Sequence, residues 1–229
     1  MDQRTFDSTW PRTERPATGP LVLRPLDLAH DMGMLHDWVN RPYARFWGLM
    51  GKSLDEVTQI YREQLERGER KYIACREDTG AAMFLMEVYD PRQDELGHHY
   101  PAQPGDCGYH LMLAPPDAAT PGMTYQLMSA ACSFLFSDPA VKRVVAEPDV
   151  RNRKILTRLM QLGFQLRGAV HLPYKTGMLV TLERAQFDAH LAGHAPARPH
   201  LRLWPLRVRL YLEMGRVART WRALRARPH

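Results

Sequence analysis

The sequence has few cysteines, no long apolar run and little net charge outside its last segment. Its three cysteines, Cys75, Cys107 and Cys132, match no metal or redox spacing and predict buried reduced thiols. No apolar run approaches the roughly 20 residues that a membrane-spanning helix needs. The first twenty residues lack a signal-peptide core, so we expect a cytoplasmic protein with a flexible lead-in over residues 1–20.

The formal net charge of +6 is concentrated at one end of the chain. Residues 195–229 hold nine arginines and one acid, Glu213, which gives them +8 and leaves residues 1–194 near −2. A basic protein suggests a nucleic-acid partner, but that interpretation applies here only to the tail, and we expect none for the body. An apolar content of 45% and 229 residues suit one large globular domain with appendages.

The basic tail is predicted to form an amphipathic helix from Pro205 onward. Three alternatives stay open: a helix on an anionic membrane surface, a helix that docks on a partner or second copy, and one that packs on its own domain. We favour the last two. The apolar stripe consists of Leu206, Leu210, Met214, Val217, Trp221 and Leu224.

Hydrophobic periodicity and turn signals predict the order β-α-α-β-β-β-α-β-α-β-β. Ser53 and Glu56 form a capping-box pattern, and Asp27 is a candidate N-cap. The helix between strands 107–114 and 141–148 implies that these two strands are parallel. We expect strands at 21–27, 71–78, 81–90, 107–116, 141–150, 164–173 and 176–185, and helices at 27–40, 54–68, 123–139 and 152–162.

The turn "EPDVRN" at residues 147–152 carries two acids and an asparagine between a strand and a helix. Asp149 and Asn152 are both candidate N-caps. Glu147 points the same way as Asp149 if the strand continues past Pro148. The residues alone therefore leave two functions open, helix capping and contact with a substrate.

His110 is the candidate proton acceptor. Alternation along its strand puts it on the face opposite Tyr109 and Leu111, and an imidazole titrates near neutral pH. The competing interpretation is a structural histidine bonded to a backbone carbonyl. For an isolated histidine, the structural interpretation is the stronger one.

Four motifs, "CGYH", "EPDVRN", "LGF" and "LPYKTGMLV", in this order and with this element order, resemble the GNAT acyl-CoA N-acyltransferases. More narrowly, they resemble the siderophore branch, which acylates N-hydroxylated amines, amino acids or lysine side chains in aerobactin-, alcaligin- and mycobactin-type pathways. The resemblance implies an α/β (α+β) GNAT domain over residues 21–190, with a mixed sheet and a splayed parallel strand pair. The Arg-rich extension 191–229 lies outside it. The resemblance also implies acetyl-CoA or succinyl-CoA as the acyl donor.

The resemblance assigns roles around the splayed pair. His110 becomes the catalytic base, and Asp149 orients its imidazole or holds the acceptor. Asn152 contacts the pantetheine arm, and a backbone N–H near Leu111 to Leu113, at a bulge, meets the oxyanion.

The cofactor and acceptor sites follow from the same resemblance. A helix N-terminus with Thr120, Gly122, Met123 and Thr124 would bind the pyrophosphate, although only Gly122 of the usual Gln/Arg-x-x-Gly-x-Gly/Ala signal is present. The acceptor would contact Phe46, Trp47 and, with lower rank, Glu147. His98 and Tyr100 would form a lid. We expect no metal, because the adjacent His98 and His99 cannot readily share one ion.

The leading hypothesis is acyl transfer to N6-hydroxylysine, N5-hydroxyornithine or N-hydroxyputrescine, whose weakly basic nitrogen arrives neutral. One alternative acceptor is an unmodified amine: a lysine side chain, a polyamine or an aminoglycoside. Its pocket should be strongly acidic, whereas the loop 91–106 offers only Asp94, Glu95 and Asp106. A second alternative is a non-catalytic binding module that uses the basic tail. The implied partners are a small-molecule amine, other siderophore-assembly enzymes through the C-terminal helix, and a second copy in a homodimer.

Overall fold

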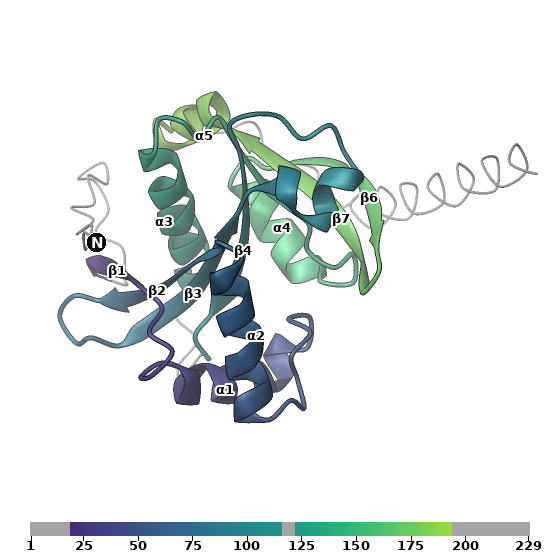
Figure 1. The fold of residues 1–229 in the computed structure, drawn as a ribbon. Helices are drawn as coiled ribbons and strands as arrows, with labels where there is room; N and C mark the ends of the chain where they lie inside the picture. The colour runs from purple at the N-terminus through teal and green to yellow at the C-terminus, as the bar shows by residue number, and fades with distance from the viewer. Residues whose placement is uncertain (1–18, 116–121, 194–229) are drawn as a thin grey trace, which may run out of the picture.

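One mixed sheet of seven strands, in the order β1-β2-β3-β4-β5-β7-β6, organises the fold (Figure 1). The computed structural model describes residues 19–115 and 122–193. Neighbouring strands are antiparallel except β4 and β5, which are parallel, as the crossover predicted. The strands are β1 (Leu21–Pro25), β2 (Arg70–Arg76), β3 (Ala82–Tyr89), β4 (Asp106–Leu113), β5 (Arg143–Ala146), β6 (Gln165–Leu172) and β7 (Lys175–Glu183).

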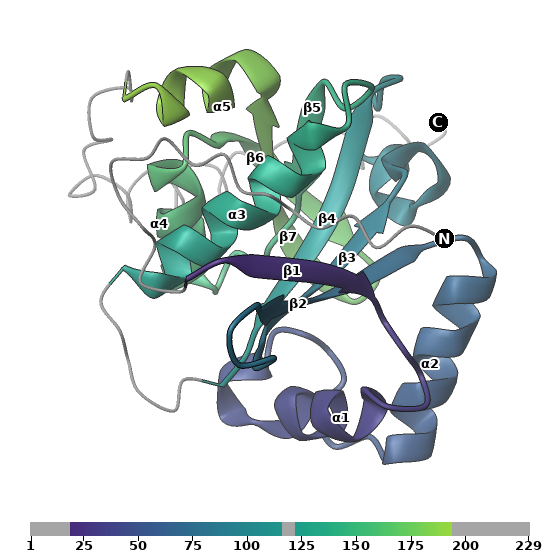
Figure 2. The ribbon, with the colours of Figure 1, turned by 90° about the vertical axis from the view of Figure 1, so that its left-hand side faces the viewer.

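Helices cover both faces of the sheet (Figure 2). α1 (Met32–Asn40) and α2 (Leu54–Glu66) lie on one face, and α3 (Met123–Ser137), α4 (Arg153–Gln161) and α5 (Arg184–Leu191) lie on the other. Successive strand residues point to opposite faces, so Ile73 packs in the α1–α2 core and Ala74 in the α3–α5 core. The described part of the chain also contains three short 3₁₀ helices: η1 (Pro42–Ala44), η2 (Pro91–Gln93) and η3 (Glu95–His98).

Two of the predicted helix caps are present, and one is wrong. Ser53 and Glu56 form the capping box, and Asn152 Oδ1 accepts a hydrogen bond from Ile155 N–H at the start of α4. Asp27 does not cap α1, which begins later, at Met32. Asp31 instead fixes the segment between Asp27 and Met32. Its carboxylate forms an ion pair with Arg24 and accepts a hydrogen bond from Asp27 N–H.

The sequence prediction also misjudged the end of the last strand. Residues 184 and 185 were expected to extend it, but α5 begins at Arg184 because Glu183 and Gln186 form a capping box. The Arg184 guanidinium donates to the carbonyl oxygens of Phe136, Asp138 and Val141, which fixes the turn between α3 and β5. β5 is also shorter than predicted.

Three predicted features lie outside the described residues. They are most of the lead-in over residues 1–20, Thr120, and the amphipathic helix from Pro205. Their assignments remain predictions.

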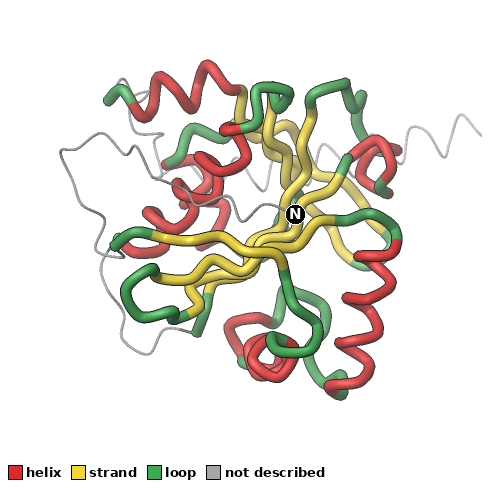
Figure 3. The backbone as a smooth tube through the Cα atoms, turned by 60° about the vertical axis from the view of Figure 1, so that its left-hand side comes forward, coloured by secondary structure: helices red, strands yellow, loops and turns green. Residues whose placement is uncertain are grey.

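The parallel strands part from each other at their carboxyl ends. Their pairing consists of Asp106↔Arg143, Cys107↔Val144 and Gly108↔Val145. Beyond these residues, β4 pairs only with β3, whereas β5 pairs with β7. Figure 3 shows the strands, in yellow, forming one layer between the red helices. The sheet therefore stays continuous while a gap opens between β4 and β5, as the splayed pair predicted.

Gly108 lies where the strands part. A Cβ at this position would meet ring carbons of Tyr89, its cross-strand neighbour, at 2.3 to 2.8 Å. The missing side chain allows the Tyr89 ring to cross β4, and the Tyr89 hydroxyl then donates to Glu147 Oε2 at 2.9 Å. Glycine in the Gly-x-His motif is therefore a packing requirement.

We expect Gly108→Ala to lower the free energy of unfolding by about 1–3 kcal/mol, because the Tyr89 ring has to move. Urea denaturation followed by circular dichroism measures this change. Gly33→Ala in α1 is the control, since an added Cβ there has nothing within 4 Å and alanine favours the helix. Equal stabilities of Gly108→Ala and wild type would show that Tyr89 does not depend on the glycine.

Candidate active site

His110 lies between two carboxylates on the sheet face that α1 and α2 cover. Its Nδ1 lies 3.2 Å from Glu87 Oε2, on the directly opposite residue of β3, and its Nε2 lies 2.7 Å from Glu147 Oε1. The imidazole is 33% exposed, whereas both carboxylates are buried. About a third of the His110 side chain is thus accessible although both nitrogens are paired.

Glu147, rather than Asp149, is the acid that faces His110. The last β4–β5 pair is Gly108↔Val145, and two further residues on each strand place His110 opposite Glu147. Glu147 also accepts from Lys175 Nζ at 2.9 Å and from the Tyr89 hydroxyl. Glu147, in the turn after β5, therefore contacts three side chains: Tyr89 from β3, His110 from β4 and Lys175 from β7.

The expected contact between Asp149 and His110 is not present. Past Pro148 the chain continues along β7, where Asp149 pairs with Gly177, one strand repeat beyond Glu147. The Asp149 carboxylate binds Arg151 through its backbone N–H, Nε and Nη2, at 2.6 to 2.9 Å. Asn152 caps α4 as expected. Asp149 is nevertheless not available to His110, because its carboxylate is paired with Arg151.

The charges around His110 favour an imidazolium. Burial lowers the pKa of His110, but the ion pairs and hydrogen bonds with Glu147 and Glu87 outweigh it and raise the pKa to about 10. Burial in turn raises the pKa of Glu147, and the contacts with His110 and Lys175 more than reverse this, so its pKa is strongly lowered. In the unliganded protein at neutral pH, both ring nitrogens therefore donate to carboxylates.

Sequence reasoning missed Glu87, Tyr89, Lys71 and Lys175. Lys71 is fully buried, and its Nζ lies 3.2 Å from Glu87 Oε1 and 3.1 Å from Glu69 Oε2. A signal was available, because Lys71 and Glu87 are charged residues next to or within the apolar runs "YIAC" and "FLMEVY". Buried lysine and glutamate are rare unless paired, so such residues predict an internal ion-pair network.

The loop 41–50 contacts His110 through Trp47, and its role as a wall for the acceptor stays a prediction. Trp47 presents its ring to His110 in an edge contact, with centroids 6.3 Å apart, and donates from Nε1 to the Tyr61 hydroxyl at 3.1 Å. The Phe46 ring has the guanidinium groups of Arg45 and Arg151 at 4.6 and 5.6 Å from its centroid. Phe46 thereby joins this loop to the turn that carries Glu147.

The predicted lid is not at His110. The Tyr100 hydroxyl donates to Asp106 at the start of β4, about 13 Å along the strand from His110. Asp106 also binds Arg143 at 2.7 Å, which joins β4 to β5. His98 is exposed at the end of η3 and makes none of the contacts around His110.

The backbone of β4 presents donors to the gap. Ala114 N–H bonds to Met83 O on β3, and bonding alternates along an antiparallel strand, so the N–H groups of Leu111 and Leu113 face the β5 side. The Leu113 carbonyl points the same way and accepts from the Tyr43 hydroxyl. The expected bulge is not seen, because β3 and β4 pair without a register shift.

The helix that should hold the pyrophosphate begins at the same edge of the sheet. α3 connects the parallel strands β4 and β5, so it starts near their carboxyl ends. Gly122, with φ of 83°, is its N-cap residue, and Met123 and Thr124 form its first turn. Their contact with a cofactor remains a prediction.

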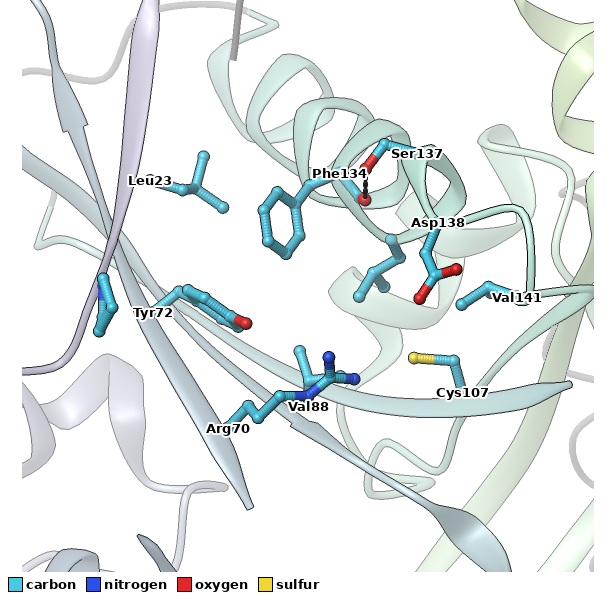
Figure 4. Close-up of a pocket in the computed structure, with 11 residues that line it drawn as sticks. Leu23, Arg70, Tyr72, Val88, Cys107, Phe134, Ser137, Asp138 and Val141 are labelled. Carbon is cyan, nitrogen blue, oxygen red and sulfur yellow. Dashed lines mark hydrogen bonds between the residues drawn. The ribbon is translucent and has the colours of Figure 1, made fainter. Parts of the chain in front are cut away.

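A separate pocket of about 390 Å³ lies on the other face of the sheet (Figure 4). Leu23, Tyr72 and Phe134 point into it, and the charged residues Arg70 and Asp138 also line it. None of the predicted site residues lines it. The pocket is therefore distinct from the cluster around His110.

A family model, curated proteins and solved structures each match the chain. The model of the acetyltransferase (GNAT) domain matches residues 27–172. An N-hydroxyputrescine acetyltransferase of Acinetobacter baumannii is 25% identical over 72% of this chain and 79% of its own length. A lysine N-acyltransferase of Mycobacterium sp. (strain MCS) is 26% identical over 79% of this chain and 74% of its own.

Solved structures support the fold. The structure of AAC(6')-Ib in complex with ribostamycin and coenzyme A has a TM-score of 0.65, with 23% identity, 73% coverage of this chain and 96% of that chain. At this identity the likeness concerns the fold alone.

Within residues 19–115 and 122–193, no helix is long and apolar enough to cross a membrane.

We expect His110 to stay protonated well above neutral pH in the unliganded protein. A titration of its Cε1–H resonance by NMR should give a pKa near 10, because two ionised carboxylates flank the ring. Glu147→Gln removes one of these charges and should lower that pKa. A His110 pKa of about 6.5 in the wild-type protein would contradict the ion-pair arrangement.

Proposed function

The chain belongs to the GNAT acetyltransferase family, and on this premise we propose that it acylates an N-hydroxylated amine in hydroxamate siderophore assembly. It is an acyl-CoA N-acyltransferase, with acetyl-CoA or succinyl-CoA as the proposed donor. The observation that carries the proposal is His110, held between Glu87 and Glu147 where β4 and β5 part. The similarity to an N-hydroxyputrescine acetyltransferase supports it.

The proposed reaction is a direct attack in the gap between the strands. The lone pair of the acceptor nitrogen attacks the thioester carbonyl carbon, and the carbonyl π electrons move to oxygen. Backbone N–H groups of Leu111 or Leu113 stabilise that oxyanion. Collapse of the intermediate breaks the C–S bond and releases the coenzyme A thiolate, while the nitrogen loses its proton.

His110 is the proposed base for that proton. It can accept only as neutral imidazole, so the Nε2 contact with Glu147 must give way to the acceptor. The neutral fraction grows tenfold per pH unit below the pKa of His110, so activity should increase from neutral to alkaline pH. No step in this sequence uses a metal ion.

The charge of the site favours a neutral acceptor. An aliphatic amine arrives as an ammonium ion and needs acidic groups to bind it. In the loop 91–106, Asp106 is occupied by Arg143, and Asp94 accepts from Leu96 N–H at the start of η3. These contacts weaken the case for an aminoglycoside or polyamine acceptor.

We expect turnover with at least one of N-hydroxyputrescine, N5-hydroxyornithine and N6-hydroxylysine, and slower turnover of their unhydroxylated counterparts. The neutral hydroxylamine nitrogen needs no deprotonation before attack. The rate of free-thiol release from acetyl-CoA and succinyl-CoA at pH 7 measures turnover of each hydroxylamine and of its unhydroxylated counterpart. Turnover of unmodified amines alone would support the alternative, and no turnover of any hydroxylamine would sink the proposal.

We expect His110→Ala to reduce kcat by about 10²–10⁴, the usual contribution of general-base catalysis, and to leave coenzyme A binding unchanged. Steady-state kinetics and calorimetric titration with coenzyme A separate the two effects. His30→Ala is the control, since His30 lies in an exposed turn before α1. An unchanged kcat would remove His110 from the mechanism.

A further inference from the structure

A chain of paired charges, with Lys71 and Glu87 buried and Glu69 half-buried, leads to the Nδ1 side of His110. It runs from Glu69 through Lys71 to Glu87, with N–O distances of 3.1 and 3.2 Å, and from Glu87 to His110 Nδ1. We propose that Lys71 and Glu87 are positioning residues, which keep the proton of neutral His110 on Nδ1 and so leave Nε2 to exchange protons with the acceptor. This inference rests on the proposed function of His110 as base.

The two oxygens of Glu87 are both occupied. Oε2 faces His110 Nδ1, and Oε1 faces Lys71 Nζ. An ionised carboxylate can only accept hydrogen bonds, so once the Nε2 contact with Glu147 has given way to the acceptor, Glu87 favours the tautomer with hydrogen on Nδ1. The lone pair of the neutral ring then lies on Nε2, which points to the turn after β5.

Lys71 keeps that carboxylate ionised. Burial raises the pKa of Glu87, and the contacts with His110 and Lys71 lower it below its usual value. The Lys71 side chain has no exposed surface, and its Nζ lies 5.2 Å from the Tyr61 ring centroid. Without Lys71, a neutral His110 would leave Glu87 buried beside an uncharged ring, which favours a protonated Glu87 and the wrong tautomer.

Stability alone does not account for this ion pair. Replacing a buried ion pair by neutral groups of similar volume is often neutral or stabilising, whereas removing one partner is strongly destabilising. A fully buried lysine near the start of β2 therefore suggests a function beyond packing. Its connection to His110 through one carboxylate supplies that function.

The titration of His110 belongs to the whole group around it. Glu87 and Tyr89 face it from β3, Glu147 from the turn after β5, and Trp47 from the loop after η1. Behind these residues, Lys71 and Tyr61 act on Glu87, and Lys175 acts on Glu147. Variants on the Glu87 side test the proposal because they leave the Glu147 side unchanged.

The experiment compares Glu87→Gln, Lys71→Met and the double variant with wild type. We expect Glu87→Gln to lower the His110 pKa, followed by NMR, by about one unit or more. The pH–kcat profile should shift to lower pH with a plateau reduced about 10- to 100-fold, and the KM for the acyl donor should stay unchanged. Arg24→Met is the control, because it breaks a strand ion pair with the buried Asp31 far from His110.

The double variant separates positioning from folding. Lys71→Met alone leaves the buried Glu87 carboxylate with one cationic partner fewer and should be less stable. Lys71→Met with Glu87→Gln removes both charges of this pair and should regain stability. The double variant should nevertheless keep the shifted pH profile and His110 pKa. A stable double variant whose His110 titration and pH profile match wild type would overturn the proposal. The NMR titration of His110 needs no acceptor, so it tests the positioning role even if the hydroxylamine assay fails. Failure of this inference and failure of the proposed function can therefore be told apart.

Discussion

The contact between His110 and Glu147 joins two strands whose backbones have already separated. β4 and β5 share three residue pairs and then turn to different neighbours, so no backbone hydrogen bond holds their carboxyl ends together. A side-chain ion pair with an N–O distance of 2.7 Å bridges the gap instead. The same separation exposes the β4 N–H groups that a thioester carbonyl would need. The site thus exists because a parallel pair ends early.

This bridge is possible only because the charges behind it are balanced. Glu87 and Glu147 are buried, and each also contacts a lysine, Lys71 and Lys175 respectively. A buried carboxylate without such partners would be neutral and could not hold an imidazolium. Gly108 contributes sterically, because the Tyr89 ring crosses the strand at this residue before its hydroxyl reaches Glu147.

Local patterns predicted the frame of the molecule but not the pairing within its site. The crossover between strands, the Ser53 capping box and the Asn152 cap depend on residues close in sequence or on general topology, and all three are present. The choice between Glu147 and Asp149 depends on the β4–β5 register, which one sequence does not reveal. Lys71 and Glu87 are 16 residues apart and meet through sheet pairing, so only their unusual place in apolar strands indicated them.

The resting charge of the site also bears on the proposed acceptor. An imidazolium at His110 repels an approaching ammonium ion, and it cannot take a proton that the ammonium must lose before attack. A hydroxylamine is neutral and avoids both difficulties, so under the proposed function the network that raises the pKa of His110 would disfavour ordinary amines. The raised pKa at the same time makes the neutral ring a stronger base for the proton that leaves the intermediate. Both effects arise from the same two carboxylates, so acceptor choice and catalytic basicity are coupled in this structure.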